Sequence, residues 1–154
     1  MGAESMGAGR RHHASNRPAR AARRDPTGTT TVLLELGFDG DGLSGVRSAV
    51  AAQVAAIPAG RLVDTMMLVA HELASNAVRH GGGSGRLRLW VGGGVLHCRV
   101  SDAGPGLAEP ASVGRVLPSP SLPGGRGLWI ARQMSELRIV SSPSGTTITA
   151  MLSL

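Results

Sequence analysis

The stretch RLVDTMMLVAHELASNAVRH, residues 61–80, carries two stripes of side chains at helical spacing. One stripe is apolar, which predicts a helix packed centrally on a sheet, and the glycines at 81–83 predict where this helix ends. The apolar stripe consists of Leu62, Met66, Val69, Leu73 and Ala77. Beside it, Glu72, Asn76 and His80 recur every four residues and therefore share one helix face. That face ends at the glycine run, where backbone can approach a ligand, which favours a binding site over an ordinary solvated face.

The polar stripe combines a carboxylate with a carboxamide. An Asn side-chain oxygen is a suitable Mg²⁺ ligand, because this ion prefers a few protein oxygens together with phosphate oxygens and water. A Glu one turn away can accept a proton from an attacking hydroxyl or water. We therefore interpret Asn76 as a metal ligand and Glu72 as a general base, with His80 in a supporting role. His71 and His97 are expected to be packed or surface residues.

A second stretch, DAGPGL at 102–107, offers a lone acid followed by two glycines. Asp102 follows a predicted strand, and its carboxylate can only accept hydrogen bonds. The exocyclic amine of adenine is a matching donor, whereas guanine places an acceptor there, so such a site selects ATP over GTP. Gly104 and Gly106 keep the neighbouring backbone clear of the ring. The alternative is that Asp102 only forms a turn.

A third stretch, GGRGLWI at 124–130, places glycines at the opening of an apolar helical run. Gly125 and Gly127 can present free backbone N–H groups to phosphate there. Arg126 either adds charge beside the phosphates or faces solvent, and the residues leave both interpretations open.

The remaining sequence predicts an α+β sandwich, with one mostly antiparallel sheet covered on one face by helices. Residues 107–124 contain four prolines and little periodicity, so they form a loop of lid length. Further helices are expected at 43–57 and 127–135. The expected strands are TVLLELGF (31–38), RLRLWV (86–91), VLHCRV (95–100), LRIVSS (137–142) and TTITAMLSL (146–154).

Composition indicates one domain with a basic tail. All sixteen basic residues are arginine, which excludes a Walker-type phosphate loop because that loop needs a lysine. Residues 1–29 show no apolar period, so we expect a disordered tail before a domain at 30–154. Six arginines against Glu4 and Asp25 give residues 1–25 a charge of +4, out of +6 for the chain. The tail has no aromatic residue for stacking, so we do not expect a nucleic-acid partner.

The single cysteine, Cys98, cannot form an internal disulfide and is expected to act as a small core residue. This fits a reducing compartment. The chain lacks an apolar run of the length of a membrane span and an apolar stretch after its basic N-terminus. We therefore expect a soluble, cytoplasmic protein with no membrane partner.

With these residues in hand, the chain over residues 31–154 resembles the GHKL (Bergerat-fold, histidine kinase-like) ATPase superfamily. HELASNAVRH resembles the N box of that superfamily, DAGPG its first glycine box, and GRGL, which ends at Leu128, its second. Gly145 and Thr146 resemble the closing Gly-Thr pair, whose hydroxyl helps to hold adenine. The resemblance therefore implies that ATP and Mg²⁺ are bound.

Within the superfamily, the chain resembles the stand-alone anti-sigma factor serine/threonine kinases (RsbW-like). Sensor histidine kinases add a helical dimerisation domain, for which this chain has no room, and the gyrase, chaperone and mismatch-repair relatives are far longer. A Glu before the Asn of the N box also suits this branch. The implied partners are an antagonist protein that is phosphorylated, a sigma factor that is sequestered, and a second copy in a homodimer.

The resemblance also implies a mechanism. Adenine would bind to Asp102 and Thr146, the phosphates would lie along Gly104–Gly106 and Gly125–Gly127, and Glu72 would accept the proton of a serine or threonine hydroxyl. One alternative is a non-catalytic, ATP-gated binding module. Another is a simple ATP hydrolase, which is less expected because no moving domain is present to use the energy.

Overall fold

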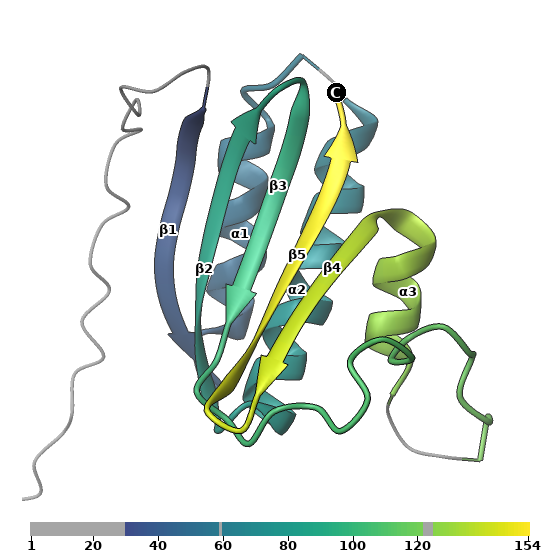
Figure 1. Ribbon diagram of the computed structural model, residues 1–154. Coiled ribbons are helices and arrows are strands. Elements are labelled where there is room, and N and C mark those ends of the chain that lie inside the picture. The colour runs from purple at the N-terminus through teal and green to yellow at the C-terminus, as the bar shows by residue number, and fades with distance from the viewer. Residues whose placement is uncertain (1–29, 59, 122–124) are drawn as a thin grey trace, which may run out of the picture.

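The computed structural model describes residues 30–58, 60–121 and 125–154 (Figure 1). This part of the chain forms five strands and three helices. In chain order they are β1 (Thr31–Asp39), α1 (Leu43–Val54), α2 (Arg61–His80), β2 (Ser84–Gly92), β3 (Val95–Ser101), α3 (Arg126–Met134), β4 (Glu136–Ser142) and β5 (Gly145–Ser153). The predicted disordered tail, residues 1–29, lies outside the described residues.

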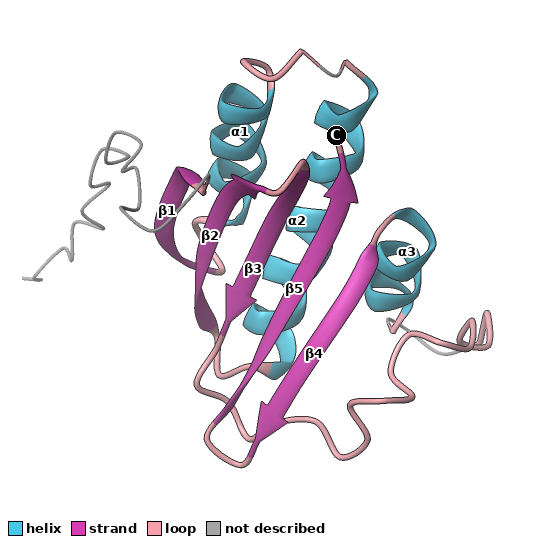
Figure 2. Ribbon diagram, turned by 45° about the horizontal axis from the view of Figure 1, so that its top comes forward, coloured by secondary structure: helices cyan, strands magenta, loops and turns pink. Residues whose placement is uncertain are grey.

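The strands form one sheet in the order β1-β2-β3-β5-β4, and every neighbouring pair is antiparallel. The three helices lie together on one face of this sheet, and none of the described residues forms a helix on its other face (Figures 1 and 2). Helix α2 packs between α1 and α3 and contacts β2, β3 and β5. The predicted α+β sandwich with a one-sided helical layer is therefore confirmed.

The hydrophobic core fills the space between the sheet and the helices. Met66, Val69 and Leu73 of the predicted α2 stripe are fully buried there. They meet inward side chains that alternate along the strands, among them Leu87 and Leu89 of β2. Full burial of one such side chain contributes roughly 1.5–3 kcal/mol, so the apolar stripe fixes which face of α2 is left for the polar residues.

Helix α2 begins and ends where the sequence predicts, and the predicted strands agree with the observed ones to within two residues at each end. The first helix, predicted over 43–57, ends earlier, at Val54. Pro58 explains the difference, because in a helix its ring would clash with the carbonyl of Val54, four residues earlier, and it has no N–H to donate there. The backbone there tightens into a turn, with the Ile57 N–H donating to the Val54 carbonyl over 2.9 Å.

The predicted loop at 107–124 contains neither helix nor strand over its described part, residues 107–121, and runs beside α3 (Figure 2). We refer to residues 107–121 as the lid segment. Within the described ranges, every helix is too short or too polar to cross a membrane.

Candidate functional site

The polar stripe of α2 faces a pocket of about 270 Å³ that lies between α2, α3 and the lid segment. Helix α2 contributes both charged and amide groups, and the other two elements contribute backbone and apolar side chains. The lining residues are Glu72, Ser75, Asn76, Arg79, His80, Leu107, Val113, Gly125, Gly127 and Leu128. The predicted face of Glu72, Asn76 and His80 is thus brought together on one wall.

Glu72 lies directly against the start of α3. A methyl group placed on Gly127 would overlap the Glu72 carboxylate oxygen Oε2. Because Gly127 has no side chain, the carboxylate can sit beside the backbone of the first helical turn. Only glycine at this position leaves that space free.

The N-terminus of α3 is built to expose backbone N–H groups. Gly125 precedes the helix with φ of 79°, a left-handed conformation that favours glycine. Among the described residues, no side chain caps the helix, so its first amides have no side-chain acceptor there. Such amides, together with the helix dipole, attract an anion to this wall of the pocket.

A polar cluster lies beyond the C-terminal end of α2. Asp102 Oδ1 accepts hydrogen bonds from the backbone N–H groups of Gly104 (3.0 Å) and Thr146 (3.2 Å). The Asp102 N–H in turn donates to the Thr146 carbonyl over 2.9 Å. The Thr146 hydroxyl lies 2.9 Å from that of Ser141. Asp102 is therefore fixed by the backbone at the point where β3 meets β5.

Close glycine contacts bring the polar cluster up to α2. A methyl group on Gly81, the residue after α2, would overlap the Asp102 carboxyl group. One on Gly104 would come within 2.6 Å of the Gly81 backbone. Leu107 links the two regions, because it lines the pocket while its N–H donates to Ser141 Oγ over 2.7 Å. The pocket and the polar cluster are thus neighbouring parts of one site.

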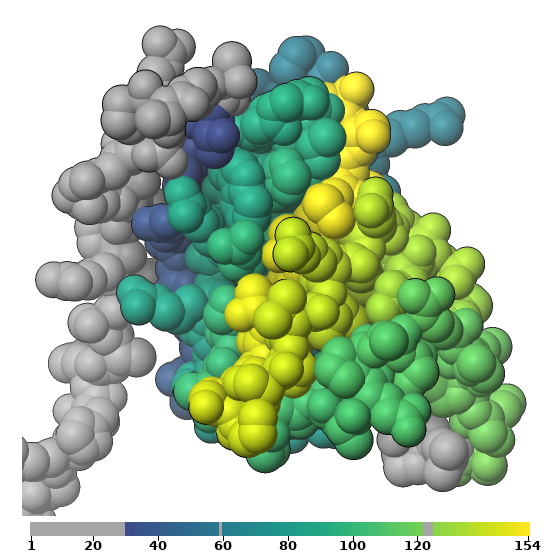
Figure 3. Space-filling model, in the orientation of Figure 1, coloured from purple at the N-terminus to yellow at the C-terminus, as the bar shows by residue number. Residues whose placement is uncertain are grey.

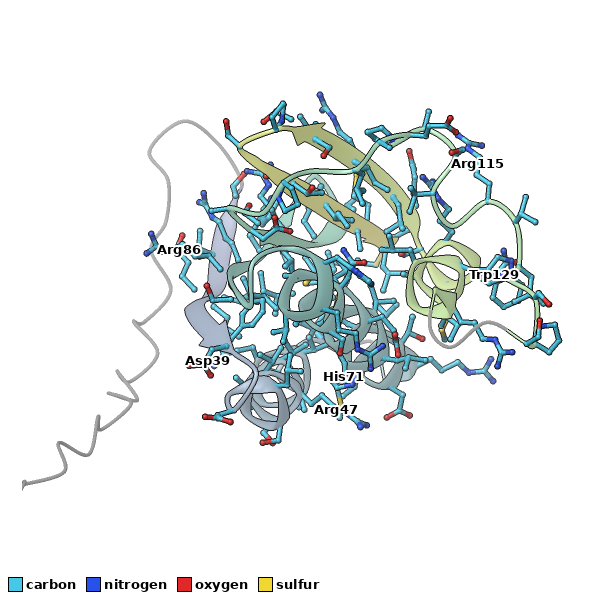
Figure 4. All side chains as sticks on the ribbon, turned by 90° about the horizontal axis from the view of Figure 1, so that it is seen from below. Asp39, Arg47, His71, Arg86, Arg115 and Trp129 are labelled. Atoms are coloured by element: carbon cyan, nitrogen blue, oxygen red, sulfur yellow. The ribbon has the colours of Figure 1, made fainter. Side chains whose placement is uncertain are left out.

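The lid segment is anchored to α3 by Arg132. Its Nε donates to the carbonyl of Val113, a pocket residue, over 2.7 Å. Partial burial and the nearby positive charge of Arg115 lower the pKa of Arg132. Gly114, with φ of 72°, lets the adjoining backbone pack on Leu128. Figure 4 shows Arg115 and Trp129 on this lid side of the molecule, away from Asp39 and Arg86.

Most residues proposed from the sequence fall in these two regions. Glu72, Asn76, His80, Gly125, Gly127 and Leu128 line the pocket, and Asp102, Gly104 and Thr146 belong to the polar cluster. Gly106 packs on the backbone of Ser142, with φ of 84°. Arg126 is exposed and does not line the pocket, which favours the solvent-facing interpretation.

Sequence reasoning missed Ser75, Arg79, Leu107, Val113 and Ser141. Arg79 follows Asn76 by three positions, so helical periodicity gave a signal for it. Ser141 faces Thr146 only through the register of the β4–β5 hairpin. Val113 belongs to the lid segment, where no periodicity assigns a side chain to a wall.

The other two histidines in the part of the chain that the structure describes make contacts within the fold. His97 stacks on Trp90 with ring centroids 4.7 Å apart. The Nε2 atom of His71 lies 3.4 Å from Ser75 Oγ. Both positions agree with the expectation that these are packed or surface residues.

The donor set of the pocket suits Mg²⁺ better than a transition metal. Among the described residues, no group of three or more His, Cys, Asp or Glu side chains could hold a metal ion. Asn76 offers one amide oxygen, with the Glu72 carboxylate one turn away in the same wall. Magnesium commonly takes one or two protein oxygens and completes its shell with phosphate and water.

Comparison with known proteins finds one match to a family model. Residues 38–152 match the family model described as a histidine kinase-like ATPase domain. No curated protein matches the chain.

Two solved structures of a blue-light activated histidine kinase, EL346 from Erythrobacter litoralis, are similar to the chain at 24% identity. The match to the structure of its histidine kinase domain covers 46% of that structure and 58% of this chain, with a TM-score of 0.47. The match to the structure of the kinase EL346 covers 31% of that structure and 60% of this chain, with a TM-score of 0.46. The chain thus spans less than half the length of either structure.

Proposed function

The chain belongs to the histidine kinase-like ATPase family, which implies ATP binding and phosphotransfer, and we propose that it is a serine/threonine protein kinase. The observation that carries the proposal is the contact between the Glu72 carboxylate and Gly127 at the start of α3. It sets a candidate base beside the backbone that attracts phosphate.

Adenine recognition is assigned to Asp102. The backbone N–H groups of Gly104 and Thr146 both donate to its Oδ1, whereas no described residue donates a hydrogen bond to its Oδ2. That oxygen is the acceptor proposed for the exocyclic amine of adenine. The Thr146 hydroxyl, held by Ser141, completes this end of the site.

Phosphate binding is assigned to the opposite end of the pocket. The uncapped N-terminus of α3 supplies backbone donors there. Arg79 adds a positive charge to the pocket wall, nearer to Gly81. Asn76 would hold Mg²⁺, which when bound neutralises charge on the phosphates.

In the proposed step, a serine or threonine hydroxyl of a partner protein enters beside Glu72. The Glu72 carboxylate accepts the hydroxyl proton as the oxygen forms a bond to the γ-phosphorus. The bond from that phosphorus to the bridging oxygen breaks, and ADP leaves.

The regulatory role is proposed from the resemblance to anti-sigma factor kinases. The acceptor is then an antagonist protein, and the kinase otherwise sequesters a sigma factor. A phosphate adds nearly two negative charges to the antagonist and weakens its grip on the kinase through charge repulsion.

The test is γ-phosphate transfer from labelled Mg-ATP to antagonist-domain proteins of the same genome. Glu72→Gln keeps the shape of the side chain and removes the base, so transfer should fall by roughly 10²–10⁴-fold while ATP binding persists. Asp64→Asn is the matched control, because Asp64 is exposed near the start of the same helix.

Three results would count against the proposal. Equal transfer by Glu72→Gln and the wild type refutes the base assignment. ATP binding without transfer to any acceptor favours the ATP-gated binding module. Sustained phosphate release without an acceptor favours a hydrolase.

A further inference from the structure

The face of the sheet opposite the helices carries a concentrated positive patch. Side chains alternate along each strand, so residues next to the buried Leu87, Leu89 and Cys98 point to the uncovered side. On the two strands β2 and β3, these outward positions include three arginines and two aromatic rings, namely Arg86, Arg88, Trp90, His97 and Arg99. We refer to these five residues as the arginine patch. Figure 3 shows this face, formed by strands lying side by side.

Strand register places two of the arginines directly opposite each other. Arg88 of β2 pairs with Arg99 of β3, and Trp90 pairs with His97 in the next outward row. Like charges at directly opposed positions destabilise a sheet. The arrangement therefore works against stability, and a local conflict of this kind is expected where a surface serves binding.

Contacts within the chain relieve this repulsion only in part. The Arg88 and Arg99 guanidinium carbons lie 5.6 Å and 5.1 Å from the Trp90 ring centroid, within cation–π range. Arg88 Nε is 3.2 Å from Glu35 Oε1, an ion-pair distance without hydrogen-bond alignment. Arg99 Nε donates to Thr149 Oγ1 over 3.3 Å. Arg99 thus has no carboxylate partner among the described residues.

The acidic residues of this face lie on its two edge strands. Glu35 and Asp39 belong to β1, and Glu136 belongs to β4. The outward positions of β5, next to β3, carry Thr147, Thr149 and Met151. The centre of the face is therefore positive without an acid, so a complementary partner presents carboxylates.

We propose that the arginine patch is a docking surface for an acidic segment of a partner protein. Guanidinium groups pair with carboxylates in a planar, bidentate manner. Neighbouring strands lie about 4.8 Å apart, and the four-residue step from Arg86 to Trp90 spans roughly 13 Å along β2. A short extended segment that lies along β2 and β3 therefore reaches every residue of the patch. The Trp90 ring supplies apolar contact beside the central pair, Arg88 and Arg99.

Three other occupants fit less well. A second copy docked through the same patch would bring the arginines together across a two-fold axis. The first 25 residues of the chain carry six arginines, so this segment is not complementary either. Single-stranded nucleic acid needs free aromatic faces for its bases, but Trp90 already stacks on His97 with an interplanar angle of 2°.

The test uses Trp90 as a reporter. The chain has two tryptophans, so Trp129→Phe leaves fluorescence from the patch alone. Octaglutamate is titrated into this full-length variant, with octaglutamine as the uncharged control. We expect a saturable change in Trp90 emission with octaglutamate only, which weakens as salt is raised.

Two double variants with reversed charges distinguish binding at the arginine patch from attraction by the net charge of the protein. Arg86→Glu with Arg99→Glu should weaken octaglutamate binding by at least about tenfold. Arg47→Glu with Arg61→Glu makes the same charge change on exposed arginines of the helical layer and should retain binding. Figure 4 places Arg47 among the helices and Arg86 away from them. ATP binding and circular dichroism should be unchanged in both.

Four outcomes would overturn the proposal. Failure of octaglutamate to change Trp90 emission means that the patch does not take an acidic segment. Equal losses in the two variants mean that net charge alone drives binding. Tighter binding of an oligothymidine of similar length would identify nucleic acid as the partner. Self-association lost only in the patch variant, without octaglutamate binding, would identify a second copy.

Discussion

The role of Glu72 as a general base depends on the absence of a side chain at Gly127. Its carboxylate occupies the space that a side chain at Gly127 would take. Gly127 lies in the first turn of α3 and has an ordinary negative φ, so alanine there brings no backbone strain. At this residue, the requirement for glycine comes from the site and not from the fold.

Gly127→Ala should therefore separate activity from stability. The new methyl group pushes the Glu72 carboxylate away from the start of α3, and transfer should fall by about 10²-fold. Replacing a helical glycine by alanine favours the helix by roughly 0.5–1 kcal/mol, so the melting temperature should stay level or rise. Transfer assays and thermal unfolding of the same samples check this. Full activity in the variant would show that the Glu72–Gly127 contact is dispensable.

Cys98 shows how burial controls the pKa of a single side chain. It is fully buried among the core side chains of β3, and this desolvation raises the pKa of its thiol to about 12. The unfolded chain ionises this thiol near pH 9, whereas the folded protein does not. Stability from this group is complete below pH 9 and is lost as pH rises toward 12, at up to about 1.4 kcal/mol per pH unit.

Two measurements check this prediction. An aromatic disulfide reagent should not react with Cys98 at pH 8 until the protein is unfolded in denaturant. In denaturant titrations above pH 9, Cys98→Ala should lose less stability with rising pH than the wild type does. Rapid labelling of the folded wild-type protein would show that the thiol is accessible.

At the scale of elements, the site depends on how α3 and the lid segment are joined. The bond from Arg132 to the Val113 carbonyl sets the position of a pocket wall that has no secondary structure of its own. Elements with few backbone hydrogen bonds open most readily, so this side-chain bond has a large share in closing the pocket.

Arg132→Met keeps the aliphatic stem of the side chain and removes this bond. We expect the KM for ATP to rise several-fold, with a stability loss of about 1–2 kcal/mol at most. Arg47→Met is the control, because Arg47 is exposed on α1 and Figure 4 shows it away from Arg115 of the lid segment. An unchanged KM in Arg132→Met would mean that the lid is positioned by other contacts.

At the scale of the whole molecule, all three helices pack on one face of the sheet, and this packing restricts how α2 can be rotated about its axis. Its apolar stripe is buried against the sheet, so Glu72, Asn76 and His80 turn toward α3 and the lid segment. The sheet brings β3 and β5 together, and their pairing sets Asp102 beside Thr146. Residues far apart in sequence thus become one site through the fold.

Periodicity predicted these features where one helix or one strand decides them. The bounds of α2 and the shared face of Glu72 and Asn76 follow from spacing within a single element. Ser141 and Val113 could not be predicted in the same way. Ser141 enters the polar cluster through hairpin register, and Val113 enters the pocket through its tertiary bond to Arg132.

The central claim, that one site holds ATP with its adenine at Asp102, is tested most directly by calorimetric titration of Mg-ATP and Mg-GTP. The wild-type protein should bind ATP more tightly than GTP by on the order of 10²-fold or more, because guanine sets an acceptor against the carboxylate. Asp102→Asn should lose ATP binding while remaining folded. Equal affinity for the two nucleotides, or unchanged ATP binding by Asp102→Asn, would contradict the account.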